Sequence, residues 1–191
     1  KANSTYLVKG IWSGIQSMLP AVMILVFAWS LTFIIGLLET GEYLAKVVTE
    51  ANIPLGLLPV ILFILAGGMA FATGTSWGSF GILLPIAGTI MINAEPTMLL
   101  PALAAVLAGS VFGDHCSPIS DTTILSSTGA GSNHMDHVTT QLPYALICAA
   151  IAAVGYLVLG LTGSVWISFG LVIIILAILF VVLAKSTKEI S

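Results

Sequence analysis

Long apolar runs separated by short polar segments occupy most of this sequence. The longest uninterrupted ones cover residues 18–38, 142–161 and 165–184, and each has about the 20 residues that a helix needs to cross the hydrocarbon core of a bilayer. Hydrophobic residues make up 58% of the chain and charged residues 7%, and the mean hydropathy is +1.13. This composition excludes an ordinary soluble domain. We therefore predict an all-α integral membrane protein with the lipid bilayer as its main partner.

The apolar runs differ in how far they are interrupted. We predict transmembrane helices over the three uninterrupted runs. Residues 54–93 are predicted to form a helical hairpin, and its arms are short enough to be either a re-entrant hairpin or two short spans. Residues 99–128 are predicted to form a discontinuous helix, because polar residues and a proline lie in the middle of an apolar segment.

The polar stretch over residues 113–123 places carboxylates, an imidazole and Pro118 in a sequence otherwise suited to lipid. Ionisable residues at such positions are costly and are usually functional. Pro118 lacks a backbone donor and clashes with the carbonyl of Asp114, so the helix is expected to unwind there and to turn freed carbonyls toward a cavity. Carbonyl, carboxylate and hydroxyl oxygens are the ligands of small hard cations, which predicts an ion site. The candidate side chains are Asp114, Asp121, Ser117, Ser120, Thr122 and Thr123.

The ionisable residues of this stretch differ in the roles that the sequence allows them. Asp114 follows Gly113, and a carboxylate there must take up a proton or find a cation. Asp121 lies seven positions on, on the same face of an unbroken helix, and the alternative is that it serves only as the N-cap of the second half-helix, a place that Ser120 could also take. For His115 three roles stay open: proton carrier, cation ligand, or hydrogen-bonded residue at a helix end.

A second interruption covers residues 72–79, where three hydroxyl residues and glycines separate two apolar arms. One interpretation brings this loop to the membrane midplane, where the N-terminus of its second arm meets the broken helix. The alternative is a plain surface turn. The spacing of His134 and His137 resembles a metal-binding pair, but no cysteine or further ligand is nearby, so we expect no metal site beyond the cation site.

Charge distribution predicts the orientation. The loop over residues 39–50 is net acidic, with Lys46 as the exception, which places both termini of the chain in the cytoplasm of a multi-pass plasma-membrane protein. The net charge of -3 predicts no nucleic-acid partner. Cys116 and Cys148 are expected to be reduced thiols. The lysines that flank the two ends are Lys1, Lys9, Lys185 and Lys188.

Residues 72–79 (ATGTSWGS) and 113–123 (GDHCSPISDTT) resemble the signature stretches of NhaC-type Na⁺/H⁺ antiporters. The similarity continues through residues 126–131, His137 and residues 141–144, in the manner of the C-terminal half of that family. The resemblance implies membership of the ion-transporter superfamily, in which each of two inverted repeats combines scaffold helices, a re-entrant hairpin and a discontinuous helix. By this resemblance Thr75 and Ser76 lie at the hairpin tip, and Asp114, Ser117, Asp121 and Thr122 lie in the ion-binding break.

These observations predict one membrane transport domain over residues 1–191, the C-terminal repeat of a larger transporter, because secondary transporters normally contain two related halves. The expected partners are the N-terminal half, Na⁺ and H⁺; a homodimer is left open, and no cofactor is expected. Burial disfavours an ionised carboxylate whereas a bound cation favours it, so Na⁺ binding expels a proton. We therefore expect a secondary active antiporter that exchanges Na⁺ for H⁺.

The main alternative is a Na⁺- or H⁺-coupled exchanger of organic acids or amino acids with the same fold. The chain contains no arginine, so a bidentate anion clamp would have to come from elsewhere. An enzyme is not expected. An intramembrane aspartyl protease needs two aspartates from opposing elements, whereas Asp114 and Asp121 share one segment, and no nucleophile-elbow motif is present. A purely structural membrane subunit would leave the buried carboxylates unexplained.

Overall fold

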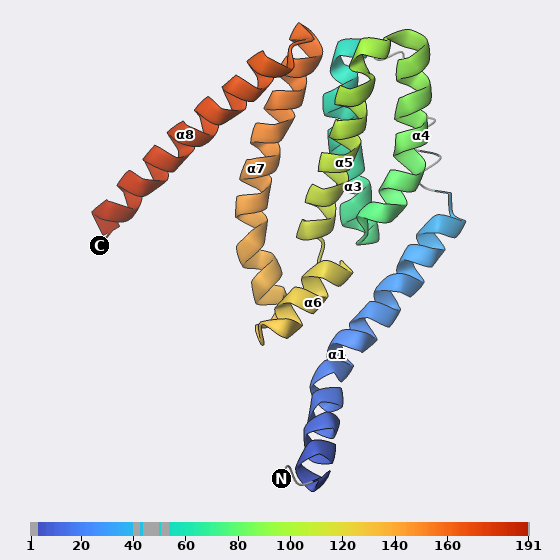
Figure 1. Cartoon of the computed structure of the whole chain (residues 1–191), viewed down its shortest axis with the longest axis vertical. Coiled ribbons are helices and arrows are strands. Elements are labelled where there is room, and N and C mark those ends of the chain that lie inside the picture. Colours follow the sequence, from blue (N-terminus) through green and yellow to red (C-terminus); the bar gives the residue numbers. More distant parts are fainter. Residues whose placement is uncertain (1–3, 40–42, 44–49, 51–53, 191) are drawn as a thin grey trace.

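The computed structural model describes residues 4–39, 43, 50 and 54–190, and this part of the chain is helical and contains no strand (Figure 1). This confirms the predicted all-α class. Lys1, Lys46 and most of the acidic loop over residues 39–50 lie outside the described residues. The helices are α1 (Ser4–Leu37), η1 (Leu55–Leu57), α3 (Leu58–Thr73), α4 (Ser76–Ala94), η2 (Pro96–Met98), α5 (Leu99–Cys116), α6 (Asp121–Gly129), α7 (His134–Thr162) and α8 (Val165–Ile190).

Within the described residues, five segments are long and apolar enough to cross a membrane. Both arms of the predicted hairpin belong to this set, with 19 residues each when η1 is counted with α3. Length therefore allows each arm to be a complete span, and the re-entrant arrangement stays a prediction. The five segments are Leu55–Thr73, Ser76–Ala94, Pro96–Cys116, His134–Thr162 and Val165–Lys185.

Helices α3, α4 and α5 lie side by side and form the packed centre of the molecule, with α7 against α3 and α5 (Figure 1). Two glycines allow α3 and α5 to approach closely. A Cβ atom at Gly109 would overlap the carbonyl group of Phe63, and one at Gly113 would overlap the carbonyl oxygen of Gly67. Small residues serve this purpose in membrane helices, where close backbone approach maximises van der Waals contact. The core around them includes Leu62, Leu83, Met91, Ala102 and Val106.

Two helices extend further toward the N-terminus than predicted. Helix α7 begins at His134 rather than near residue 142, so much of the predicted polar loop is helical. The reason is a cap: the side chain of Asn133 accepts hydrogen bonds from the backbone amides of Met135 and Asp136, at 2.9 and 3.2 Å. Helix α1 begins at Ser4 rather than near residue 18, so the lead-in segment and the first apolar run form one helix.

Candidate functional site

The helix predicted over residues 99–128 consists of two parts. Helix α5 ends at Cys116, α6 begins at Asp121, and residues 117–120 connect them in extended and turn conformations around Pro118. The backbone amide of Ser117 donates to the carbonyl of Asp114 at 3.1 Å, and the amide of Ser120 donates to the carbonyl of Ser117 at 3.3 Å. Residues 117–120 are called the break below.

The turn between α3 and α4 contacts this break. It consists of Gly74, whose φ of 72° favours glycine, and Thr75. A Cβ atom at Gly74 would lie 2.6 Å from the carbonyl oxygen of Ile119, so only glycine fits. The hydroxyl of Ser117 donates to the carbonyl of Phe71 at 2.7 Å and fastens the end of α3 to the break. The two interruptions therefore meet, while the position of this contact at the membrane midplane stays a prediction.

Asp114 lies at this junction with 6% of its surface exposed. Its Oδ2 accepts a hydrogen bond from Ser76 Oγ at 3.0 Å, and its Oδ1 accepts one from Ser120 Oγ. Thr122 Oγ1 lies 2.7 Å from Ser120 Oγ and 3.5 Å from Asp114 Oδ1. We call Asp114, Ser76, Ser120 and Thr122 the Asp114 cluster. Among the described residues the hydrogen-bond partners of this carboxylate are all hydroxyls, so no basic side chain there neutralises its charge.

Four predicted site residues lie near the cluster without joining it. Ser117 uses its hydroxyl on α3, as described above. Thr75 occupies the N-cap position of α4 but makes no side-chain cap hydrogen bond. Asp121 is half-buried in the first turn of α6, next to the actual N-cap Ser120. His115 is exposed, and its Nδ1 lies 3.0 Å from the carbonyl of Val111.

Four carbonyls at or next to the break have hydrogen-bond partners within the protein, so these four do not meet the expectation that freed carbonyls face a cavity. Local amides occupy the carbonyls of Asp114 and Ser117, and side chains from α6 and α7 occupy two others. The carbonyl of His115 accepts from Thr123 Oγ1 at 3.3 Å and from Gln141 Nε2 at 3.0 Å. The carbonyl of Pro118 lies 2.6 Å from His134 Nε2. Buried backbone groups must find partners, and here other helices supply them.

Helix α7 thus contributes two residues that the sequence did not identify for this role. His134 and Gln141 are seven positions apart, so they lie on one face of α7 two turns apart. Because a carbonyl oxygen only accepts hydrogen bonds, His134 Nε2 is the donor to Pro118, and Ser127 Oγ lies 3.1 Å from the other ring nitrogen. No group of metal-ligating side chains is found among the described residues, and His134 supports the break instead. Had α7 been predicted to begin at residue 134, this spacing would have indicated the shared face.

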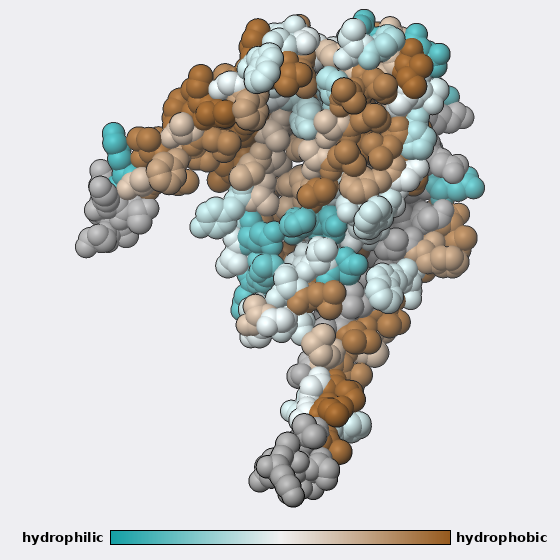
Figure 2. All heavy atoms as spheres, in the orientation of Figure 1, coloured by the Kyte–Doolittle hydropathy of each residue, from teal (hydrophilic) through white to brown (hydrophobic). Residues whose placement is uncertain are grey.

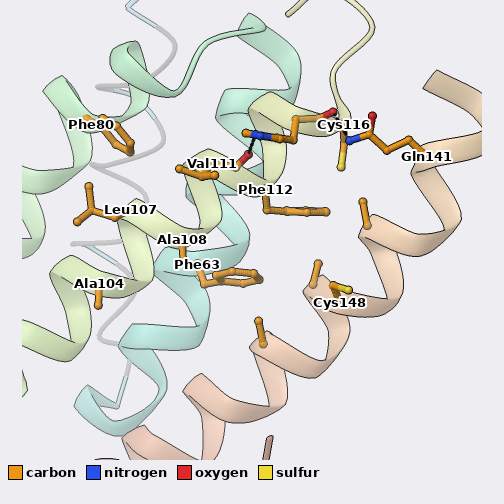
Figure 3. A pocket seen from close by; sticks show the side chains of 14 residues that line it. Phe63, Phe80, Ala104, Leu107, Ala108, Val111, Phe112, Cys116, Gln141 and Cys148 are labelled. Carbon is orange, nitrogen blue, oxygen red and sulfur yellow. Dashed lines mark hydrogen bonds between the residues drawn. The ribbon is translucent and has the colours of Figure 1, made fainter. Parts of the chain in front are cut away.

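Two cavities adjoin the break. The smaller, of about 350 Å³, is lined by residues with polar side chains, one of which is Thr122 of the Asp114 cluster. The larger, of about 780 Å³, is an apolar groove between α5 and α7, with Gln141 near one end (Figure 3). His115 also lines it. Hydrophilic residues gather around α6 and the adjoining end of α7, while the faces above them are mainly apolar (Figure 2). The smaller cavity is lined by His115, Thr122, Thr123, Ser126, His137 and Gln141.

Known proteins resemble this chain in sequence. It is 60% identical over 151 residues to an uncharacterized protein of Haemophilus influenzae, covering 79% of this chain and 29% of that protein. It is 33% identical over 157 residues to the malate-2H⁺/Na⁺-lactate antiporter of Bacillus subtilis, covering 77% of this chain and 31% of that protein. An arginine/ornithine antiporter of Halobacterium salinarum is 34% identical over 112 residues, covering 55% of this chain and 22% of that protein.

The chain thus spans less than a third of the length of these relatives. No solved structure matches it. The sequence profile of the Na⁺/H⁺ antiporter family matches residues 3–161, which is most of the chain. The chain therefore belongs to the Na⁺/H⁺ antiporter family.

Proposed function

We propose that this chain forms the ion-binding part of a secondary antiporter that exchanges Na⁺ for H⁺ across the plasma membrane, with both ions competing for Asp114. The observation that carries this proposal is a buried carboxylate whose partners in the described structure are three hydroxyl residues, at the contact of two helix interruptions. A carboxylate without a basic partner in an apolar setting must bind a proton or a cation.

The Asp114 cluster has the chemistry for both states. Carboxylate and hydroxyl oxygens are hard ligands that can replace the water around a small cation. Helices α4 and α6 both begin beside Asp114. When a proton binds instead, the carboxyl group becomes a hydrogen-bond donor and the hydroxyls can reorient around it. Exchange then needs only alternate exposure of the cluster to the two sides of the membrane.

The smaller cavity offers a route to the cluster. Thr122 is exposed on the cavity side and is hydrogen-bonded within the cluster, so water or an ion in the cavity is one side chain away from Asp114. Asp121, Thr75, Ser117 and His115 lie in the same region, and their predicted parts in ion binding remain proposals. The partnership with an N-terminal half and the cytoplasmic location of both termini are likewise proposed from the sequence.

Substitution of Asp114 tests the proposal. In the complete protein reconstituted into liposomes, Asp114→Asn should reduce Na⁺-driven proton movement to background while the protein still folds, because the charge is lost and the volume is kept. Asp136→Asn is the matched control, since Asp136 is exposed on α7. The KM for Na⁺ of the wild type should fall as pH rises, because protons compete for the carboxylate. Unchanged exchange in Asp114→Asn, or a KM independent of pH, contradicts the proposal.

Organic exchange is the second candidate, and the names of two relatives favour it: malate and lactate for one, arginine and ornithine for the other. The apolar groove, whose lining includes the polar side chains of His115 and Gln141, has room for such a molecule. The same liposomes, loaded with each of these compounds, separate the two functions. Proton movement that requires an organic substrate on one side of the membrane favours organic exchange. Proton movement driven by Na⁺ alone favours Na⁺/H⁺ exchange.

A further inference from the structure

Two buried hydroxyls, one on α4 and one on α5, have no hydrogen-bond partner among the described residues: those of Ser79 and Ser110. Ser79 is 1% exposed and Ser110 is 0% exposed. Most buried polar side chains in proteins are satisfied, so each exception calls for a bound water, a bound ion or some other cause.

Helix periodicity places both hydroxyls on the faces that carry the Asp114 cluster. Ser79 follows Ser76 by three positions on α4, and Ser110 precedes Asp114 by four positions on α5. The hydrogen bond between Ser76 and Asp114 joins the first turn of α4 to the last turn of α5, so these neighbouring helices run antiparallel there. Ser79 and Ser110 therefore lie about one turn deeper between α4 and α5, at a common level.

The polar region ends at this level. One turn further along each helix, Leu83 follows Ser79 and Val106 precedes Ser110, and both apolar side chains are 0% exposed. The α4–α5 interface thus contains a short polar section, bounded by Asp114 at one end and by apolar core at the other. Ordinary helix packing does not require two unpaired hydroxyls at this position, whereas an ion dehydrated beside Asp114 needs additional oxygen ligands.

We propose that Ser79 and Ser110 are further ligands of the transported cation, which binds between their hydroxyl oxygens and the Asp114 carboxylate. This inference rests on the proposed function and extends the site one turn beyond the residues predicted from the sequence. The ligand class is a small monovalent cation, because one carboxylate with neutral hydroxyls balances a single charge. A divalent ion would leave an uncompensated charge in the apolar interior.

Thermal unfolding provides a test that does not depend on transport. The purified complete protein is heated in NaCl and in choline chloride at equal ionic strength, and Na⁺ should raise the Tm of the wild type because it binds only the folded form. In choline, Ser79→Ala and Ser110→Ala should leave the Tm unchanged or raise it, since each removes an unpaired buried hydroxyl. In both variants the Na⁺-dependent rise in Tm should be largely lost.

Transport gives the second readout. The KM for Na⁺ should rise about tenfold in each alanine variant, which corresponds to one lost ligand, while the maximal rate changes less. Ser79→Cys and Ser110→Cys keep the side-chain shape and replace a hard oxygen with soft sulfur, so they should show the same losses if the alanine variants fold poorly. Thr89→Val is the control on α4, because the Thr89 hydroxyl is exposed and bonded to the carbonyl of Pro85 at 2.9 Å.

The outcomes separate the two proposals. If Na⁺ stabilises the wild type, and Asp114→Asn abolishes this effect while both serine variants retain it with a normal KM, the proposed function stands and this inference is overturned. If the wild type itself shows neither stabilisation by Na⁺ nor Na⁺-driven proton movement, both are overturned. Loss of the Na⁺ effect in Asp114→Asn and in the serine variants, with Thr89→Val unaffected, supports both.

Discussion

The central helix α5 is less apolar than the outer helix α8, whereas in soluble proteins the buried helices are the more apolar ones. The most apolar 18 residues of Val165–Lys185 have a mean hydropathy of 3.2, and 6% of them are buried. In Pro96–Cys116, which carries Asp114, the corresponding 18 residues have a mean hydropathy of 1.7, and 39% of them are buried. On α8, large apolar side chains such as Trp166 and Phe180 are 83% and 74% exposed. The less apolar helix therefore lies inside, and the more apolar one outside.

The physical reason is the solvent. Lipid tails are as apolar as leucine, so burial of apolar surface does not by itself drive helices together in a bilayer. Close backbone contact and hydrogen bonds do, and α5 has both through Gly109, Gly113 and the Asp114 cluster. In α5, the glycines and the aspartate that lower the hydropathy of the span are thus the residues that place it at the centre.

Loss of a close-contact glycine should have the largest effect on this arrangement. Gly109→Val places a branched side chain against the backbone of Phe63, and we expect no folded protein, with destabilisation above about 4 kcal/mol. Gly170→Val on α8 meets no atom within 4 Å and should leave folding unchanged. Monodispersity after detergent extraction measures both. Equal recovery of the two variants would show that the α3–α5 contact does not hold the centre together.

Removal of an aromatic ring should destabilise the protein less than Gly109→Val does, and again more at a central position than on α8. Phe63 is 4% exposed and packs against Tyr156 at a ring distance of 5.3 Å. Phe63→Ala should lower the free energy of unfolding by about 2–4 kcal/mol through the cavity that it leaves. Phe180→Ala on α8 should change it by less than about 0.5 kcal/mol. Denaturant titration in detergent measures the free energy of unfolding of both variants. A larger loss for Phe180→Ala would show that α8 lies inside and α3 outside.

The smallest expected effect concerns the support that α7 gives to the break. His134→Leu removes the donor to the Pro118 carbonyl and should cost about 1–3 kcal/mol of stability, because that carbonyl is left unsatisfied. The KM for Na⁺ should rise as well, since Ser120 lies two positions beyond Pro118. His134→Gln retains an N–H donor and should recover most of both losses. Thr139→Val, an exposed hydroxyl bonded within α7, is the control. Identical behaviour of the leucine and glutamine variants would exclude a role for this hydrogen bond.

The sequence by itself determined the class of fold and the position of the break. Apolar runs of span length leave the backbone no partners except its own, which makes helices obligatory, and the ring of Pro118 cannot continue an α-helix. The contact between the two interruptions could also be predicted from the sequence, because helix ends with unsatisfied amides and a buried carboxylate attract one another. Asp114 was identified because an uncompensated carboxylate in lipid needs an explanation.

Only the tertiary structure decided which side chains from different helices contact one another. Spacing fixes the face of a helix on which a residue lies, but not which other helix that face contacts. Ser76 and Ser120 reach Asp114, whereas Ser117 is bonded to α3. The start of α7 at His134 depends on the Asn133 cap, and that start brings His134 and Gln141 to the carbonyls of Pro118 and His115 at and next to the break. Such contacts join residues far apart in the chain, and their energies depend on distances that only the packed helices set.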